Sequence, residues 1–234
     1  MRSLFDEISL VLPKKIIEIL HNVGMSYFLR IPSYKANVPI ISVVLSRWDE
    51  AVGGFKISHH VILFNPEVIS SLIGMSDHGT SFNWVTTYPN LSIVIRDIKD
   101  TLKFAVNSTC RDPQQIASLI IKFILSALFF PKNNYSVHSA LIECAENFHL
   151  VSIINWCKSI YNFLHPFFLP LSQVHRKSSL HDQLLVTSMD SACLSCLRFW
   201  KISISELLHT LMRFQRFLGG PQIYFGTSMK LKIV

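Results

Sequence analysis

Two cysteines and two histidines are the residues whose types and spacing come nearest to a chemical site. Cys193 and Cys196 form a Cys-x-x-Cys pair, and His59 is followed directly by His60. A structural zinc site needs four ligands, usually from a second pair at short spacing, and neither pair has one nearby. A redox Cys-x-x-Cys opens a helix after a strand, which this region does not show. The pattern favours core cysteines and a polar hairpin turn, so we expect no metal and no cofactor.

Other catalytic patterns are missing from the printed sequence. It has no Gly-x-Ser-x-Gly, no His-x-x-x-His and no glycine-rich phosphate loop. Its 8 glycines lie mostly where helices are expected to end, and no paired carboxylates stand out among its 15 acidic residues. We therefore expect a protein that is not an enzyme and has no small-molecule substrate.

The composition indicates a folded, apolar, intracellular chain. Half of the residues are hydrophobic, 16% are charged, and the mean hydropathy is +0.35. A disordered chain would be poor in apolar residues and rich in charge. Asp6 and Glu7 stand where a signal peptide would have its basic and apolar regions. Five cysteines, an odd number without framework spacing, indicate reduced thiols.

The longest apolar stretch, residues 116–130, raises the alternative of a membrane-associated protein. Spanning a bilayer takes about 20 mostly apolar residues. This run is shorter, contains Lys122 and ends at Pro131. A buried core helix explains it better, and we do not expect a membrane partner.

The net charge of +7 leaves open another alternative, a basic nucleic-acid-binding domain, because phosphate binding grows with the number of cations presented. The basic residues are scattered, however, and the densest group is only His175-Arg176-Lys177. Solubilising surface charge on an apolar domain is the favoured interpretation.

Periodicity and capping signals predict a mainly α fold, a helical bundle with one small β-hairpin near residues 54–64. After the hairpin, Asn65 and Pro66 are suited to start a helix, and Gly74 to end it in the left-handed conformation. The expected domain organisation is a helical lead-in, one helical domain and a C-terminal tail: residues 1–35, 36–221 and 222–234.

The second half of the chain is predicted to be strongly helical. Residues 80–107 look irregular, with one possible strand at residues 91–95. A helix at residues 153–164 is expected to end before Pro166, because proline interrupts helical hydrogen bonding. An exposed loop at residues 166–187 would follow. The other expected helices cover residues 112–130, 136–148, 188–200 and 203–219.

The order of these features resembles the plant mobile domain, a plant-specific family found in transposable elements and in host genes derived from them. The resemblance rests on short motifs spread over roughly residues 36–221. The motif residues are Trp48, Asp49, Phe55, Phe64, Glu67, Leu72, Gly74, Gly79, Asn155 and Trp156. Where the family usually has a glycine before Cys193, this sequence has Ala192.

The resemblance implies a non-enzymatic module that binds an unknown protein partner, in the nucleus, in transposon-derived or silencing complexes. The label "aminotransferase-like" attached to the family implies no chemistry, because a pyridoxal phosphate enzyme needs a Schiff-base lysine in a large α/β fold. The motif residues would be mostly architectural. Gly74 and Gly79 would supply special backbone conformations, and the core would be anchored by Trp48, Phe55, Phe64, Leu72 and Trp156.

One packing relationship follows from the spacing. Trp156 shares a helical face with Ile160 and Phe163. That face is expected to pack against residues 116–130, which are apolar nearly all round. Asn155 points off this stripe, so its amide is expected to bond to backbone at a neighbouring loop or helix end.

Overall fold

The computed structural model describes residues 12–30, 43–57, 60–87, 93–108, 112–132 and 134–177. The helices are α2 (Lys14–Asn22), α4 (Pro66–Ile73), α5 (Ile95–Asn107), α6 (Pro113–Ile124), α7 (Ser139–Glu146), α8 (Phe148–Ile153) and α9 (Trp156–Lys177). The 3-10 turn η1 (Ser26–Arg30) follows α2, and the π-helical turn η2 (Leu125–Phe129) follows α6 directly. The strands are β1 (Trp48–Asp49), β2 (Gly54–Ile57) and β3 (His60–Leu63). The predicted mainly α fold with one small hairpin is confirmed.

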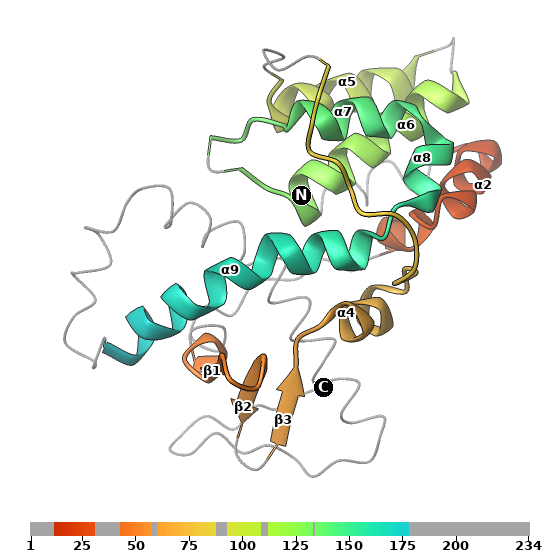
Figure 1. The fold of residues 1–234 in the computed structure, drawn as a ribbon. Coiled ribbons are helices and arrows are strands. Elements are labelled where there is room, and N and C mark those ends of the chain that lie inside the picture. Colours follow the sequence, from red (N-terminus) through yellow and green to blue (C-terminus); the bar gives the residue numbers. More distant parts are fainter. Residues whose placement is uncertain are drawn as a thin grey trace, which may run out of the picture.

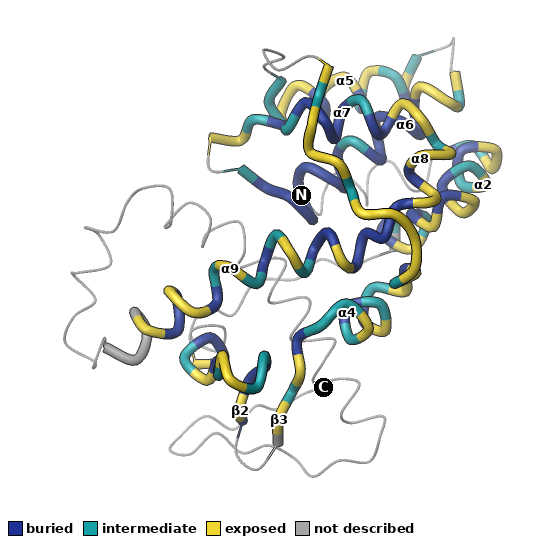
Figure 2. Tube along the Cα trace, in the orientation of Figure 1, coloured by how far each residue is buried: buried dark blue, intermediate teal, exposed yellow. Residues whose placement is uncertain are grey.

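The long helix α9 lies between two groups of elements (Figure 1). On one side, α2, α5 and α7 pack around α6, with α8 leading from α7 to the start of α9. On the other side, α4 and the three-stranded sheet pack against α9. Buried residues follow α9 along its length and fill α6 (Figure 2).

The sheet has the order β1-β2-β3, with both pairs antiparallel. The predicted hairpin is the β2–β3 pair, in which Phe55 lies opposite Ile62. The sequence did not indicate β1, whose Trp48 lies opposite Phe55 on the other side. The motif residues of this region therefore sit on neighbouring strands and share one sheet face.

Helix α4 begins and ends as the sequence indicated. The Asn65 side chain accepts a hydrogen bond of 2.8 Å from the Val68 N–H, and Pro66 occupies the first turn. Glu67 adds a negative charge where the helix dipole is positive. At the other end Gly74 has φ +68°, the expected left-handed conformation.

The apolar run at residues 116–130 lies in the centre of the helical group. Its residues are buried except for Lys122, which is half-buried. The Lys122 ammonium is 2.8 Å from Glu146 Oε1 of α7, so the one charge in the run is paired at the edge of the core. Within the described ranges, no helix is long and apolar enough to span a bilayer.

Two expectations were wrong. Residues 95–107, expected to be irregular or extended, form α5, which buries Ile98, Leu102 and Val106 at helical spacing. The helix expected to end before Pro166 continues as α9 to Lys177, so part of the expected loop at 166–187 is helical. The helices expected at 188–200 and 203–219, Cys193, Cys196 and the C-terminal tail lie outside the described residues.

Candidate functional site

An aromatic cluster joins the sheet to α9. The ring of Phe168 lies 4.8 Å from Trp48, 5.3 Å from Phe55 and 4.7 Å from Phe64, measured between centroids. All four side chains are almost completely buried. Because such edge and tilted pairs add to the free energy of area burial, three motif aromatics hold the sheet in place through one residue of α9.

Charged residues in β1, in β2 and directly after β1 support the same cluster. Lys56 Nζ is 2.6 Å from Asp49 Oδ2, and this bond is the main cause that lowers the pKa of the Asp49 carboxyl. The indole N–H of Trp48 donates to Glu50 Oε2 at 2.8 Å. Asp49 thus links β1 to β2 at the surface, and Glu50 satisfies the one polar atom of a buried tryptophan.

A second group of motif residues meets where α9 begins. Asn155 is the residue before α9, and its side-chain oxygen accepts from the Lys158 N–H at 2.7 Å, which caps the helix. Its side-chain N–H donates to the Asp77 carbonyl, as expected of an amide bonded to a loop backbone. The backbone of Thr80 makes two further bonds here: its N–H donates to Ile153 O, and its carbonyl accepts from the Asn155 N–H.

Gly79 completes this joint. Its φ is +129°, and a Cβ atom built on it would lie 2.3 Å from Ile153 O and 3.0 Å from Asn155 N. Real Cβ atoms essentially never come closer than about 3 Å to such atoms, so only glycine fits without movement. Gly79 and Asn155, which are distant in sequence, therefore approach each other directly through their backbones.

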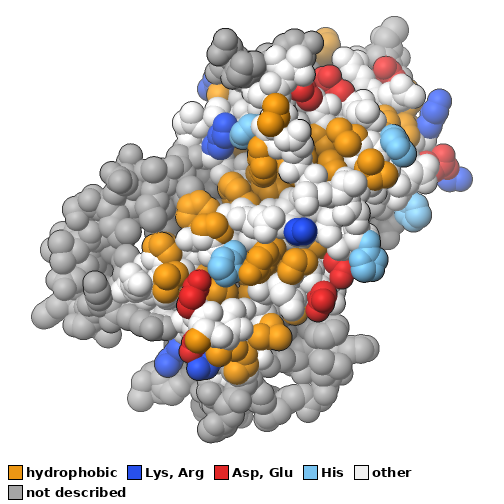
Figure 3. Space-filling model, in the orientation of Figure 1, with side chains coloured by type: hydrophobic (Ala, Val, Ile, Leu, Met, Phe, Trp, Pro, Cys, Tyr) orange, Lys and Arg blue, Asp and Glu red, His pale blue; other side chains and the backbone are white. Residues whose placement is uncertain are grey.

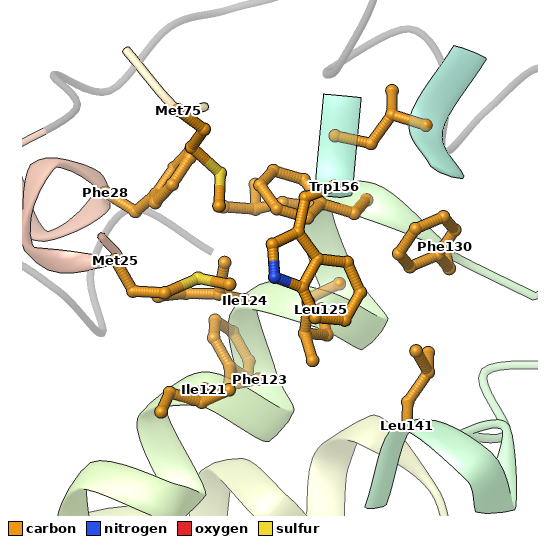
Figure 4. Close-up of a cluster of buried hydrophobic side chains, with 14 of the residues drawn as sticks. Met25, Phe28, Met75, Ile121, Phe123, Ile124, Leu125, Phe130, Leu141 and Trp156 are labelled. Carbon is orange, nitrogen blue, oxygen red and sulfur yellow. The ribbon is translucent and has the colours of Figure 1, made fainter. Parts of the chain in front are cut away.

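Trp156, the residue after Asn155, lies in a cluster of buried hydrophobic side chains (Figure 4). It is buried, and its indole N–H donates to Val151 O at 2.9 Å. Its ring contacts Phe130 with centroids 6.1 Å apart, and side chains of α6 and η2 surround it. The predicted packing of Trp156 against residues 116–130 is present.

Residues 79–87, which we call the strap, run in extended form across the face of the helical group (Figures 1 and 2). The Gly79–Asn155 joint holds one end. At the other end, Thr86 Oγ1 and the Thr87 N–H donate to the two carboxylate oxygens of Glu143 on α7, the latter at 3.2 Å. The strap is therefore fixed at both ends to different helices.

The middle of the strap carries two aromatic residues with opposite roles. Phe82 packs under the strap, 5.4 Å from Trp156 between centroids. Trp84 lies at the surface, 36% exposed, with its ring 5.1 Å from Phe130 and 5.0 Å from the His138 imidazole. Val85 is 77% exposed. Hydrophobic side chains gather over the strap and α9 on this face (Figure 3).

His138 is the titratable group beside Trp84. It precedes α7, and its Nδ1 accepts a hydrogen bond of 3.4 Å from the Ala140 N–H. Partial burial lowers the pKa of the imidazole, and the charge of Lys132 lowers it further. The neutral form is thereby favoured, which is the form that can accept from Ala140.

The motif residues thus fall into three places. The motif aromatics of the sheet form one group with Phe168. The Gly79–Asn155 joint forms a second group, and α4 carries further motif residues, of which Leu72 is buried. Sequence reasoning missed Phe168, Trp84 and Glu143. Phe168 follows a proline that indicated a loop, and the other two belong to no motif; the only signal for Trp84 was a large aromatic in a segment without periodicity.

The described residues do not bring together three or more His, Cys, Asp or Glu side chains that could hold a metal. Cys144 and Cys157 are free and buried, and burial raises the pKa of Cys144 to about 12 and of Cys157 to about 11. His59 and the side chain of His60 lie outside the described residues.

The fold and this surface define a mainly α domain in which a long helix carries a small sheet on one side and an extended strap on the other. Residues 4–181 match the family described as "Domain of unknown function (DUF8566)", a range that includes every described element. The chain belongs to this family. No curated protein and no solved structure matches it.

Proposed function

We propose that this domain is a non-enzymatic protein-interaction module that binds its partner through the strap. The observation that carries the proposal is the exposure of Trp84 and Val85 on a segment that is fixed at both ends. Partially buried tryptophans surrounded by packed aromatic rings are typical centres of binding energy at protein interfaces.

The fixed ends of the strap matter because a rigid surface loses less conformational entropy on binding than a mobile one. Glu143 holds Thr86 and Thr87, and the Thr80 bonds to Ile153 and Asn155 hold the other end. Phe82 packs beneath, so the side of Trp84 that faces solvent is presented in one orientation.

The cellular setting in this proposal rests on the resemblance to the plant mobile domain. We place the module in the nucleus, in complexes with transposon-derived or silencing proteins. The alternative of membrane association through residues 116–130 has less support, because these side chains fill the core between α2, α5, α7 and Trp156.

The test is affinity capture from plant nuclear extract with quantitative mass spectrometry, using two matched variants. Val85→Glu places a charge on the strap, and Phe104→Glu places one on α5; both parent side chains are 77% exposed. Neither change removes core packing, and thermal unfolding of each purified variant checks this. We expect Val85→Glu to lose specific partners that wild type and Phe104→Glu retain.

Equal capture by all three proteins would contradict the proposal. Nuclease treatment of the extract adds a second readout. If the partners that depend on Val85 disappear after nuclease treatment, the module binds nucleic acid rather than protein, and that outcome would also overturn it.

A further inference from the structure

The outer edge of β3 is open along the described part of the chain. The sheet order β1-β2-β3 places β3 at an edge, and only β2 pairs with it among the described residues. Its sequence, His60-Val61-Ile62-Leu63, has none of the lysines or prolines that commonly protect edge strands from pairing with another chain.

The register shows which backbone groups face outward. The Lys56 N–H donates to Arg47 O on the β1 side at 2.9 Å, so Lys56 and the opposite Val61 form a pair without mutual hydrogen bonds. The Phe64 N–H donates to Gly53 O at 3.0 Å, so the neighbouring pair, Leu63 and Gly54, also has no mutual hydrogen bonds. The N–H and C=O groups of Val61 and Leu63 therefore point away from β2.

The side chains of the same two residues are half exposed, Val61 at 49% and Leu63 at 46%. Both lie on the outer face of the sheet, opposite the face that carries Phe55 and Ile62. Leu63 lies opposite Gly54, which gives it no side chain to pack against on β2. The edge thus offers outward backbone groups and an apolar pair in the same place.

We propose that β3 pairs antiparallel with β3 of a second copy of this chain, forming a transient two-fold dimer. If Ile62 of both copies lies on the two-fold axis, Val61 faces the partner's Leu63 and Leu63 faces the partner's Val61. The outward N–H and C=O groups of both residues then bond across the seam. An isologous contact requires such self-complementarity, and a strand of this pattern supplies it.

The charges of the sheet are compatible with this register. Lys56 is already paired with Asp49 on its own sheet. In the dimer the two Lys56 residues lie on strands three spacings apart, roughly 14 Å at about 4.8 Å per strand, and they are also offset by two residues along the strand, so they are further apart than this. That exceeds the screening length of about 8 Å at physiological salt, so no like charges oppose each other at the seam.

The short strand limits the affinity. One four-residue strand on each copy falls in the class of small interfaces, below about 1,200 Å² in total, that form transient complexes. We therefore expect association to depend on protein concentration. It involves a different surface from the strap, so it can fail or hold independently of the proposed function.

The experiment is sedimentation velocity of the purified full chain over a wide range of concentration. Val61→Pro removes an N–H that faces outward and leaves the β2–β3 bonds intact, while Leu63→Lys places a charge at the seam. Phe104→Lys on α5 is the control. We expect the average mass of wild type and of Phe104→Lys to rise toward that of a dimer, and both edge variants to stay monomeric.

A wild type that stays monomeric throughout, or edge variants that dimerise like wild type, would overturn the proposal. Hydrogen exchange of the wild-type amides at Val61 and Leu63 decides the matter if the edge variants do not fold. These amides should exchange more slowly as concentration rises. Strong protection already in the dilute monomer would mean that the edge is occupied by something other than a second copy.

Discussion

Gly79 lies directly against the backbone of Asn155, at the point where the strap meets the start of α9. No side chain fits at this contact, because a Cβ on Gly79 would lie only 2.3 Å from the Ile153 oxygen, as well as 3.0 Å from the Asn155 nitrogen. Since Asn155 also caps α9 and bonds to Asp77, this contact fixes the position of the strap relative to the long helix.

Gly79→Ala should therefore destabilise the domain more than an ordinary substitution at positive φ. We expect a loss of at least about 2 kcal/mol, from overpacking together with backbone strain. Gly24→Ala is the control, because Gly24 has φ +75° but nothing within 4 Å of an added Cβ. Its loss should stay near the roughly 1–2 kcal/mol of the backbone term. Urea unfolding measures both, and equal losses would show that the close approach to Ile153 is not a constraint.

The two bonds of the Asn155 side chain predict a comparison with another capping asparagine. Asn147 caps α8 through a bond of 3.1 Å from the Leu150 N–H, and it is exposed. Asn147→Ala should cost about 0.5–2 kcal/mol, the usual range for loss of a cap. Asn155→Ala should cost a further 0.5–1.5 kcal/mol or so, because it also loses the bond to Asp77. If chemical denaturation gives the same loss for both, the link to Asp77 contributes nothing.

Much of the fold could be predicted from local signals, and the errors have identifiable physical causes. Pro166 was expected to end a helix, yet α9 continues through Pro166 and Pro170. Both prolines are exposed, and so is Asn162. The Asn162 carbonyl has no helical partner, because Pro166 has no N–H to donate. The carbonyl groups without a helical partner thus belong to exposed residues, and the buried Phe168 on the same helix favours continuation.

The other error was a competition between two patterns in one segment. The β-branched run at residues 91–95 indicated a strand, and Val94 does form an isolated bridge to Ser136. From Ile95 onward, the spacing of Ile98, Leu102 and Val106 is helical and decides the structure. The strap could not be predicted at all, because tertiary contacts to Glu143 and Asn155 hold it, and these leave no local pattern.

Trp156 should be the most costly aromatic residue of the helical group to truncate. Trp156→Ala removes a buried indole from the space between Phe82, Phe130 and α6, so we expect a loss of about 3–5 kcal/mol. Trp84→Ala removes a tryptophan that is partly in solvent and should cost clearly less. Thermal and chemical unfolding of both variants test the ranking, and a larger loss at Trp84 would mean that the strap, not Trp156, anchors the core.

The two described cysteines should resist alkylation in the folded protein. Burial raises the pKa of Cys144 to about 12 and of Cys157 to about 11, so the reactive thiolate is scarce at mildly alkaline pH. Site-resolved mass spectrometry after brief iodoacetamide treatment should find both unmodified in native protein and modified in urea. Rapid native modification of Cys157 would place it at an accessible surface instead.

His138 should make the stability of the domain sensitive to mild acid. Burial and Lys132 lower the pKa of its imidazole below 6.5 in the folded state, so the folded protein binds fewer protons than the unfolded chain. The stabilisation is fully present above the unfolded pKa of 6.5 and is lost as the pH falls through the lower folded value. Protonation also removes the Nδ1 acceptor for Ala140 and places a positive charge at the start of α7.

His138→Asn keeps a capping acceptor without titrating, so its free energy of unfolding should fall less on acidification than that of wild type. The exposed His149→Asn serves as the control, and urea unfolding on both sides of pH 6.5 is the measurement. Parallel pH profiles for wild type and His138→Asn would show that His138 is not the sensitive group.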